Sequence, residues 1–159
     1  MCRVPVHEID RYARDLITGL DHWYVGFIDW NAVLNRDGGP GHIVNPVPAT
    51  IMVDTTDNSL YMSPTYYIMR AFSQFIRPGA QVLTTTVTVA SSVTATDYDG
   101  TPTQDGDAII ATAAENSDGS TIVEVFNETK GAIPYAIVLG SSTISVTIPS
   151  QALQTVVMN

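Results

Sequence analysis

The chain has 159 residues, of which 45% are hydrophobic and only 14% are charged, so it is globular and has room for one ordinary domain or two small ones. Its 7 basic and 16 acidic residues give a net charge of -9, which argues against nucleic acid and anionic membranes as partners. The single cysteine, Cys2, excludes an internal disulfide and a cysteine-ligated zinc site, and no apolar run is long enough for a membrane span. Residues 1–10 contain no apolar core of signal-peptide length, so we expect no targeting segment at the start of the chain as given.

The first third of the chain has the pattern of a helix followed by a strand. Residues 6–23 carry apolar side chains at intervals of three and four, which predicts an amphipathic helix. The β-capable residues 24–28 predict a short strand, and after Asn31 the chain enters a loop with three glycines and a proline at 38–41. A helix and a strand in this order are half of an α/β repeat.

The residues at the end of this strand form the main candidate binding site. Asp29, Trp30 and Asn31 place a carboxylate, an indole and an amide at the carboxyl end of the strand, where barrels of strand-helix units bind ligands. The indole suits the face of a sugar or aromatic ring, and the polar groups suit hydroxyls. The alternative is structural, with Trp30 capping a helix-strand core and Asp37-Gly38-Gly39-Pro40 forming an ordinary turn. The residues alone leave both interpretations open.

A second helix follows the glycine-rich loop. Residues 50–54 are a short apolar run that predicts a strand, and residues 60–62 could pair back on it. Ser63-Pro64 has the pattern of an N-cap followed by proline at the first helical position, so we expect a helix over residues 65–76. Pro78-Gly79 ends this helix.

The second half of the chain is an all-β sequence, rich in Thr, Val, Ile and Ser with alternating side chains. Seven short strands at this spacing are typical of an antiparallel sandwich. The candidate strands are residues 81–89, 92–96, 107–114, 120–127, 133–139, 142–148 and 152–157. We therefore expect an α/β part at residues 1–79 and a β-sandwich at residues 80–159.

The other patterns predict no metal ion and no cofactor. The three histidines share no metal-ligand spacing, and the intervals between Asp97, Asp99, Asp105 and Asp107 do not fit an EF-hand loop. Asn127-Glu128-Thr129 is a glycosylation sequon, which has a meaning only in a secreted protein.

Eight segments, taken in chain order, carry a family resemblance that extends over nearly the whole sequence. They are Phe27-Ile28-Asp29-Trp30-Asn31, Asp37-Gly38-Gly39-Pro40, Asn45, Ile51-Met52-Val53-Asp54, Tyr66-Tyr67, residues 72–80, Ile148-Pro149-Ser150 and Gln154-Thr155-Val156-Val157. Together they resemble the C-terminal part of glycoside hydrolase family 30, the glucosylceramidase and β-1,6-glucanase family. The sequence departs from the family pattern at Arg70-Ala71, where the family usually has Gly-His.

The resemblance implies a fold and a set of binding residues. Residues 1–79 would be the last helix, strand and helix of a (β/α)8 TIM barrel, and residues 80–159 the β-sandwich that packs beside it. In this family the tryptophan and asparagine after the eighth strand line the glucose pocket. Trp30 is therefore expected to contact sugar, with Asn45 as a second candidate, while Asp29 and Asn31 would fix the shape of the loop.

The resemblance also implies what this chain does not carry. Retaining glycosidases use two carboxyl groups about 5–5.5 Å apart, and in this family both belong to strands before the eighth. Glu8 is the only carboxylate early enough to be considered, but it precedes the helix 6–23 and lacks a strand that would hold it. We therefore expect no catalytic residue in the chain, and whether it is itself an enzyme stays uncertain.

Two functions from different classes remain. The first is the C-terminal part of a retaining β-glycosidase acting on a β-glucoside or glycolipid, such as glucosylceramide or β-1,6-glucan, and inactive alone. Its full-length parent would be secreted or lysosomal. The alternative is a non-catalytic sandwich module that binds carbohydrate or another surface. In the first case the exposed barrel edges would favour self-association.

Overall fold

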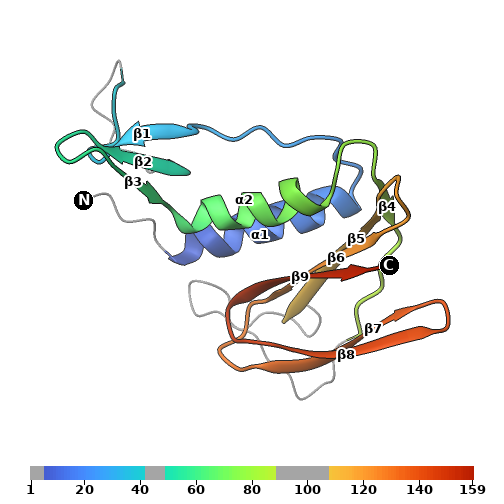
Figure 1. The fold of residues 1–159 in the computed structure, drawn as a ribbon. Coiled ribbons are helices and arrows are strands. Elements are labelled where there is room, and N and C mark those ends of the chain that lie inside the picture. The colour runs from blue at the N-terminus through green and yellow to red at the C-terminus, as the bar shows by residue number, and fades with distance from the viewer. Residues whose placement is uncertain (1–5, 42–48, 89–107) are drawn as a thin grey trace.

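The computed structural model describes residues 6–41, 49–88 and 108–159, and the side chains from Arg11 onward. Two helices, α1 (Val6–Asp21) and α2 (Pro64–Phe75), lie side by side in the middle of the molecule (Figure 1). A small three-stranded sheet lies at one end of the helix pair, and a larger sheet packs along one side of it (Figure 1). Within the described residues, neither helix is long and apolar enough to cross a membrane.

Both predicted helices are confirmed. α1 buries Ala13, Leu16 and Ile17, one stripe of its surface, as the three-and-four spacing predicted. α2 begins at Pro64 and ends where the Ile76 N–H donates to the Phe72 carbonyl over 2.9 Å. Ser63 occupies the N-cap position, but its hydroxyl makes no cap hydrogen bond. It donates instead to the Thr50 carbonyl at 3.0 Å, which joins the start of α2 to the small sheet.

The strand expected at residues 24–28 does not form, and this prediction was wrong for the described chain. These residues run across the molecule from the end of α1 to the small sheet without pairing (Figure 1). The first strand comes later, as β1 (Val33–Asn35), which pairs parallel with β2 (Ile51–Asp54). β2 then pairs antiparallel with β3 (Ser59–Met62). A strand needs a hydrogen-bonding neighbour, and residues 25–31 make no backbone hydrogen bond to the rest of the described chain.

The β-rich half is confirmed as two antiparallel layers. Four strands form one sheet in the order β4-β5-β6-β9, and two form a separate hairpin, β7-β8. Their bounds are β4 (Gln81–Leu83), β5 (Ile109–Glu115), β6 (Thr121–Asn127), β7 (Ile133–Leu139), β8 (Ser142–Ile148) and β9 (Ala152–Met158). The strand expected over 81–89 is shorter, and the one expected over 92–96 lies outside the described residues.

The central sheet is covered on both faces. β6, which lies between β5 and β9, has every residue buried. Alternate side chains of β6 point to opposite faces, so Phe126 packs against α1 and α2 while Val123 and Val125 pack toward the hairpin. The helix side of the core contains Ala13, Leu16, Ile17, Ile68, Phe72 and Phe126. The helices and the sandwich therefore share one folded body.

Asn116 connects the end of α2 to the turn between β5 and β6. Its Nδ2 donates to the Phe75 carbonyl at 2.9 Å and to the Ser120 hydroxyl at 3.1 Å. Its Oδ1 accepts from the Arg77 N–H at 3.0 Å. Arg77 and Asp118 form an exposed ion pair beside it, with 2.5 Å between Nη1 and Oδ2. The buried amide of Asn116 thus joins the helical part of the chain to the sandwich.

Candidate functional site

Trp30 lies on the surface, close to the start of β1. Its side chain is 84% exposed, so it does not cap a core between helix and strand, which was the structural alternative for this residue. The Trp30–Asn31 peptide bond is cis, and Asn31 is half-buried beside it. Most of the surface of this indole is therefore open to a ligand. Its contact with sugar stays a prediction.

Asp29 fixes the backbone next to this indole. Its Oδ1 accepts a hydrogen bond from the Tyr12 hydroxyl over 2.6 Å, and its Oδ2 accepts from the Thr50 hydroxyl over 3.2 Å. Tyr12 belongs to α1 and Thr50 precedes β2, so one carboxylate joins the helix and the sheet on either side of Trp30. Tyr12 also contacts Phe27 edge to face, with ring centroids 6.2 Å apart. Asp29 is therefore held by its neighbours and is placed to orient the loop.

The structure does not describe the side chains of two other candidate residues, Asn45 and Glu8. Asn45, predicted as a second sugar contact, lies outside the described residues. Glu8 lies in α1, but its side chain is not among those described. Within the described part of the chain, no group of three or more histidine, cysteine or acidic side chains could hold a metal ion.

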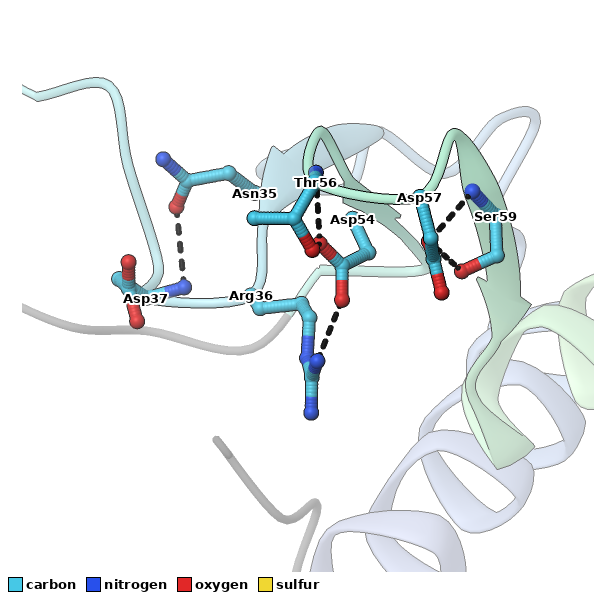
Figure 2. Close-up of polar contacts among 7 residues, drawn as sticks. All are labelled: Asn35, Arg36, Asp37, Asp54, Thr56, Asp57 and Ser59. Carbon is cyan, nitrogen blue, oxygen red and sulfur yellow. Dashed lines mark hydrogen bonds and ion pairs between the residues drawn. The ribbon is translucent and has the colours of Figure 1, made fainter.

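A polar cluster that sequence reasoning did not single out lies at the other end of β1 (Figure 2). Asn35 Oδ1 accepts from the Asp37 N–H at 3.0 Å and from the Gly39 N–H at 2.8 Å. Arg36 pairs with the buried Asp54, whose Oδ1 also accepts from Thr56 through its hydroxyl at 2.6 Å and its N–H at 2.9 Å (Figure 2).

These contacts stabilise the carboxylate of Asp54. The hydroxyl of Thr56, its N–H and the Arg36 guanidinium together lower the pKa of Asp54 to about 2. The acid is therefore ionised near neutral pH. Both of its oxygens accept hydrogen bonds that shape the turns after β1 and β2. An Asp followed two residues later by Thr is the sequence signal that could have identified this turn. The cluster positions the loop and does not present a reactive group.

The segment that precedes Trp30 is apolar and exposed. Its large side chains are Trp23 at 92% exposure, Tyr24 at 55%, Val25 at 105%, Phe27 at 36% and Ile28 at 96%. We call residues 23–30 the apolar segment. A continuous apolar run is typical of a strand in a parallel sheet with both faces covered, and here the backbone has no strand on either side within the described chain.

Comparisons with known proteins show which protein family this chain matches. The model of the glycosyl hydrolase family 30 TIM-barrel domain matches residues 5–76, and that of the glycosyl hydrolase family 30 beta sandwich domain matches residues 79–156. The lysosomal acid glucosylceramidase of Mus musculus is 32% identical over 127 residues, which are 80% of this chain and 22% of that protein. Putative glucosylceramidase 4 of Caenorhabditis elegans is 41% identical over 71 residues, 45% of this chain and 14% of its own length. This chain thus spans about a fifth or less of these relatives.

Solved structures agree on the fold. SrfJ from Salmonella typhimurium superposes with a TM-score of 0.80 at 24% identity, over 96% of this chain and 31% of that one. The endo-beta1,6-glucanase BT3312 superposes with a TM-score of 0.75 at 19% identity, over 92% of this chain and 30% of that one. The expected fold, the last part of a TIM barrel followed by a β-sandwich, is confirmed. Since the two family models together account for nearly all residues from 5 to 156, the chain belongs to glycoside hydrolase family 30.

Proposed function

We propose that this chain is the C-terminal part of a retaining β-glycosidase that hydrolyses a β-glucoside, with glucosylceramide and β-1,6-glucan as the candidate substrates. The proposal is supported by relatives named glucosylceramidase and by a structural neighbour named as an endo-beta1,6-glucanase. We place the boundary between the barrel part, 1–79, and the sandwich, 80–159, close to the gap between the two family models, of which the first ends at residue 76 and the second begins at residue 79.

The observation that carries the proposal is the exposed indole of Trp30 above an anchored loop. A sugar ring presents C–H groups on one face, which stack on an aromatic ring, and its hydroxyls bond to polar groups nearby. Asp29 is occupied by Tyr12 and Thr50, so we assign it and Asn31 to holding the loop. Trp30 is assigned to the sugar contact, and Asn45 is the second candidate.

Fluorescence can test this assignment because the chain has two tryptophans, Trp23 and Trp30, of similar exposure. In Trp23→Phe only Trp30 emits, and in Trp30→Phe only Trp23 emits. An aryl-free β-glucoside should quench or shift the emission of Trp23→Phe and leave Trp30→Phe unchanged. Equal responses of the two variants would reject Trp30 as a sugar platform. Retained binding of a β-glucan by both variants would favour the alternative, a binding module located in the sandwich.

We infer that this chain by itself does not hydrolyse glycosides. A retaining enzyme needs an acid and a nucleophile about 5–5.5 Å apart on either side of the bond. Asp29, the carboxylate next to Trp30, is already bonded to Tyr12 and Thr50 and is not presented to a ligand. The purified chain should therefore give no turnover of a chromogenic aryl β-glucoside. Turnover that Glu8→Gln abolishes would contradict this inference.

The apolar segment supports a proposal about partners. Val25 and Ile28 are almost fully exposed, and an exposed apolar segment with unpaired backbone groups is a template for pairing with another chain. We expect this chain to self-associate through residues 23–30. In light scattering, Val25→Lys and Ile28→Lys should reduce the apparent mass at high concentration. Val138→Lys is the matched control because Val138 is 69% exposed but lies on the hairpin. A wild-type chain that stays monomeric would refute the proposal.

A further inference from the structure

Glu124 is a fully buried acid in the middle of the central sheet. It is 0% exposed, and β5 and β9 place Thr112 and Thr155 directly opposite it. Side chains two residues apart on a strand point to the same face, so Glu124 shares the face of Phe126, which packs against the helices. The carboxyl group therefore lies at the interface between the sheet and the helix pair.

The hydrogen-bond geometry at this group fits two protons better than one. The Thr155 Oγ1 lies 3.0 Å from Oε1 and 2.8 Å from Oε2 of Glu124. A threonine hydroxyl has one hydrogen, so it can satisfy only one oxygen of a carboxylate well. A protonated carboxyl supplies the second hydrogen: its O–H donates to Oγ1 while the Thr155 hydroxyl donates to the other oxygen. The two short contacts fit a neutral acid better than a buried anion.

The charged groups around Glu124 do not compensate an anion. On α1, Arg14 pairs with Glu128, which follows the far end of β6, and Asp21 accepts from the Thr112 hydroxyl at 2.6 Å. On α2, Arg70 is exposed and its Nε donates to Gln74 at 2.8 Å.

The other charged side chains described on α1, Arg11 and Asp15, are exposed. The residues of β5 and β9 directly opposite the carboxyl are threonines, Thr112 and Thr155. Among the described side chains of α1, the acid Asp21 contacts the sheet through Thr112, which lies directly opposite Glu124.

We propose that Glu124 is a pH switch at the interface between α1 and the central sheet, where the neutral carboxyl stabilises the packed state and the carboxylate destabilises it. Burial raises the pKa of Glu124 to about 7, with the Thr155 hydroxyl acting in the opposite direction. Partial burial of its carboxyl group also raises the pKa of Asp21, the last residue of α1. Both acids therefore bind a proton more readily in the folded chain than unperturbed acids do.

The direction of the pH effect follows from linkage. Between the ordinary pKa of 4.5 and about 7, the folded chain keeps a proton on Glu124 that the unfolded chain has lost. The contribution to stability is complete below pH 4.5 and is lost as the pH rises through 7. The folding constant should fall by at most about 300-fold over this interval from Glu124 alone, or roughly tenfold per pH unit.

A carboxyl titration tests the proposal on the wild-type chain. The chain has four glutamates, so labelling their side-chain carboxyl carbons with 13C gives a small set of resonances to follow from pH 4 to pH 9. One resonance, absent in Glu124→Gln, should titrate near pH 7. Infrared spectra at pH 6 should likewise show a protonated-acid carbonyl band that Glu124→Gln removes. A Glu124 resonance that titrates like an ordinary glutamate would overturn the proposal.

Stability measurements separate the switch from a packing role. The urea midpoint of the wild type should fall between pH 5 and pH 8, and Glu124→Gln should lose that dependence. Glu115→Gln, at an exposed position on β5, is the matched control and should keep it. An unchanged pH dependence in a folded Glu124→Gln would refute the switch.

Discussion

Replacing Asn116 by alanine tests whether one buried amide joins the two parts of this chain. The substitution removes hydrogen bonds of 2.9, 3.0 and 3.1 Å to the Phe75 carbonyl, the Arg77 N–H and the Ser120 hydroxyl. Each bond is worth about 1 kcal/mol net, and the backbone groups left behind at the end of α2 add to the loss. We expect a destabilisation of about 3 kcal/mol, which corresponds to roughly 6–12 °C in Tm for a domain of this size.

Urea unfolding followed by circular dichroism measures this loss. Ser117→Ala is the control, because Ser117 is an exposed neighbour in the same turn and surface substitutions usually change stability by less than about 0.5 kcal/mol. If α2 and the sandwich unfold together, Asn116→Ala lowers one common midpoint. A change in Asn116→Ala no larger than that in Ser117→Ala would show that the amide contributes nothing to the junction.

Three further predictions concern single residues. Neighbouring hydroxyls lower the pKa values of Asp54 and Asp118 to about 2. The stability that these acids give above pH 3.8 should therefore be lost as the pH falls through 2. Acid unfolding titrations of Asp54→Asn and Asp118→Asn should lack this loss. Asn127 is 0% exposed and its Nδ2 donates to two carbonyls at 2.8 Å, so the folded chain from a glycosylating host should carry no glycan there; an enzymatic deglycosylation that changes its mass would contradict this. Gly79→Ala should cost about 1–2 kcal/mol in urea unfolding because φ is +88°, whereas Gly131→Ala, also in open space, should be close to neutral.

Local patterns in the sequence determined the helices and most strands. The apolar spacing that predicted α1 and the proline that opens α2 act within a turn or two of the chain, so tertiary contacts were not needed to recognise them. The alternation in β7 and β8 is equally local. The family motifs around Trp30 can also be recognised in a single sequence. The candidate binding residue could therefore be named before its exposure was known.

Other features depend on what lies beside a segment, and sequence alone does not specify that. Residues 24–28 have the composition of a strand, yet a strand exists only where a second strand accepts its hydrogen bonds. The sequon at Asn127 reads as a surface signal, but the residue is buried because its amide closes the loops after β6 and β8.

The clearest case is β6, where Ile122, Glu124 and Phe126 alternate with Val123 and Val125. Such a strand predicts one dry face and one face on which an acid could reach water. In the structure the helix pair covers one face and the hairpin side the other, so every residue of β6 is buried. The sequence determined that these residues form a strand. Only the packing of distant elements decided that Glu124 is fully buried, and this burial is what raises its pKa above that of an ordinary glutamate.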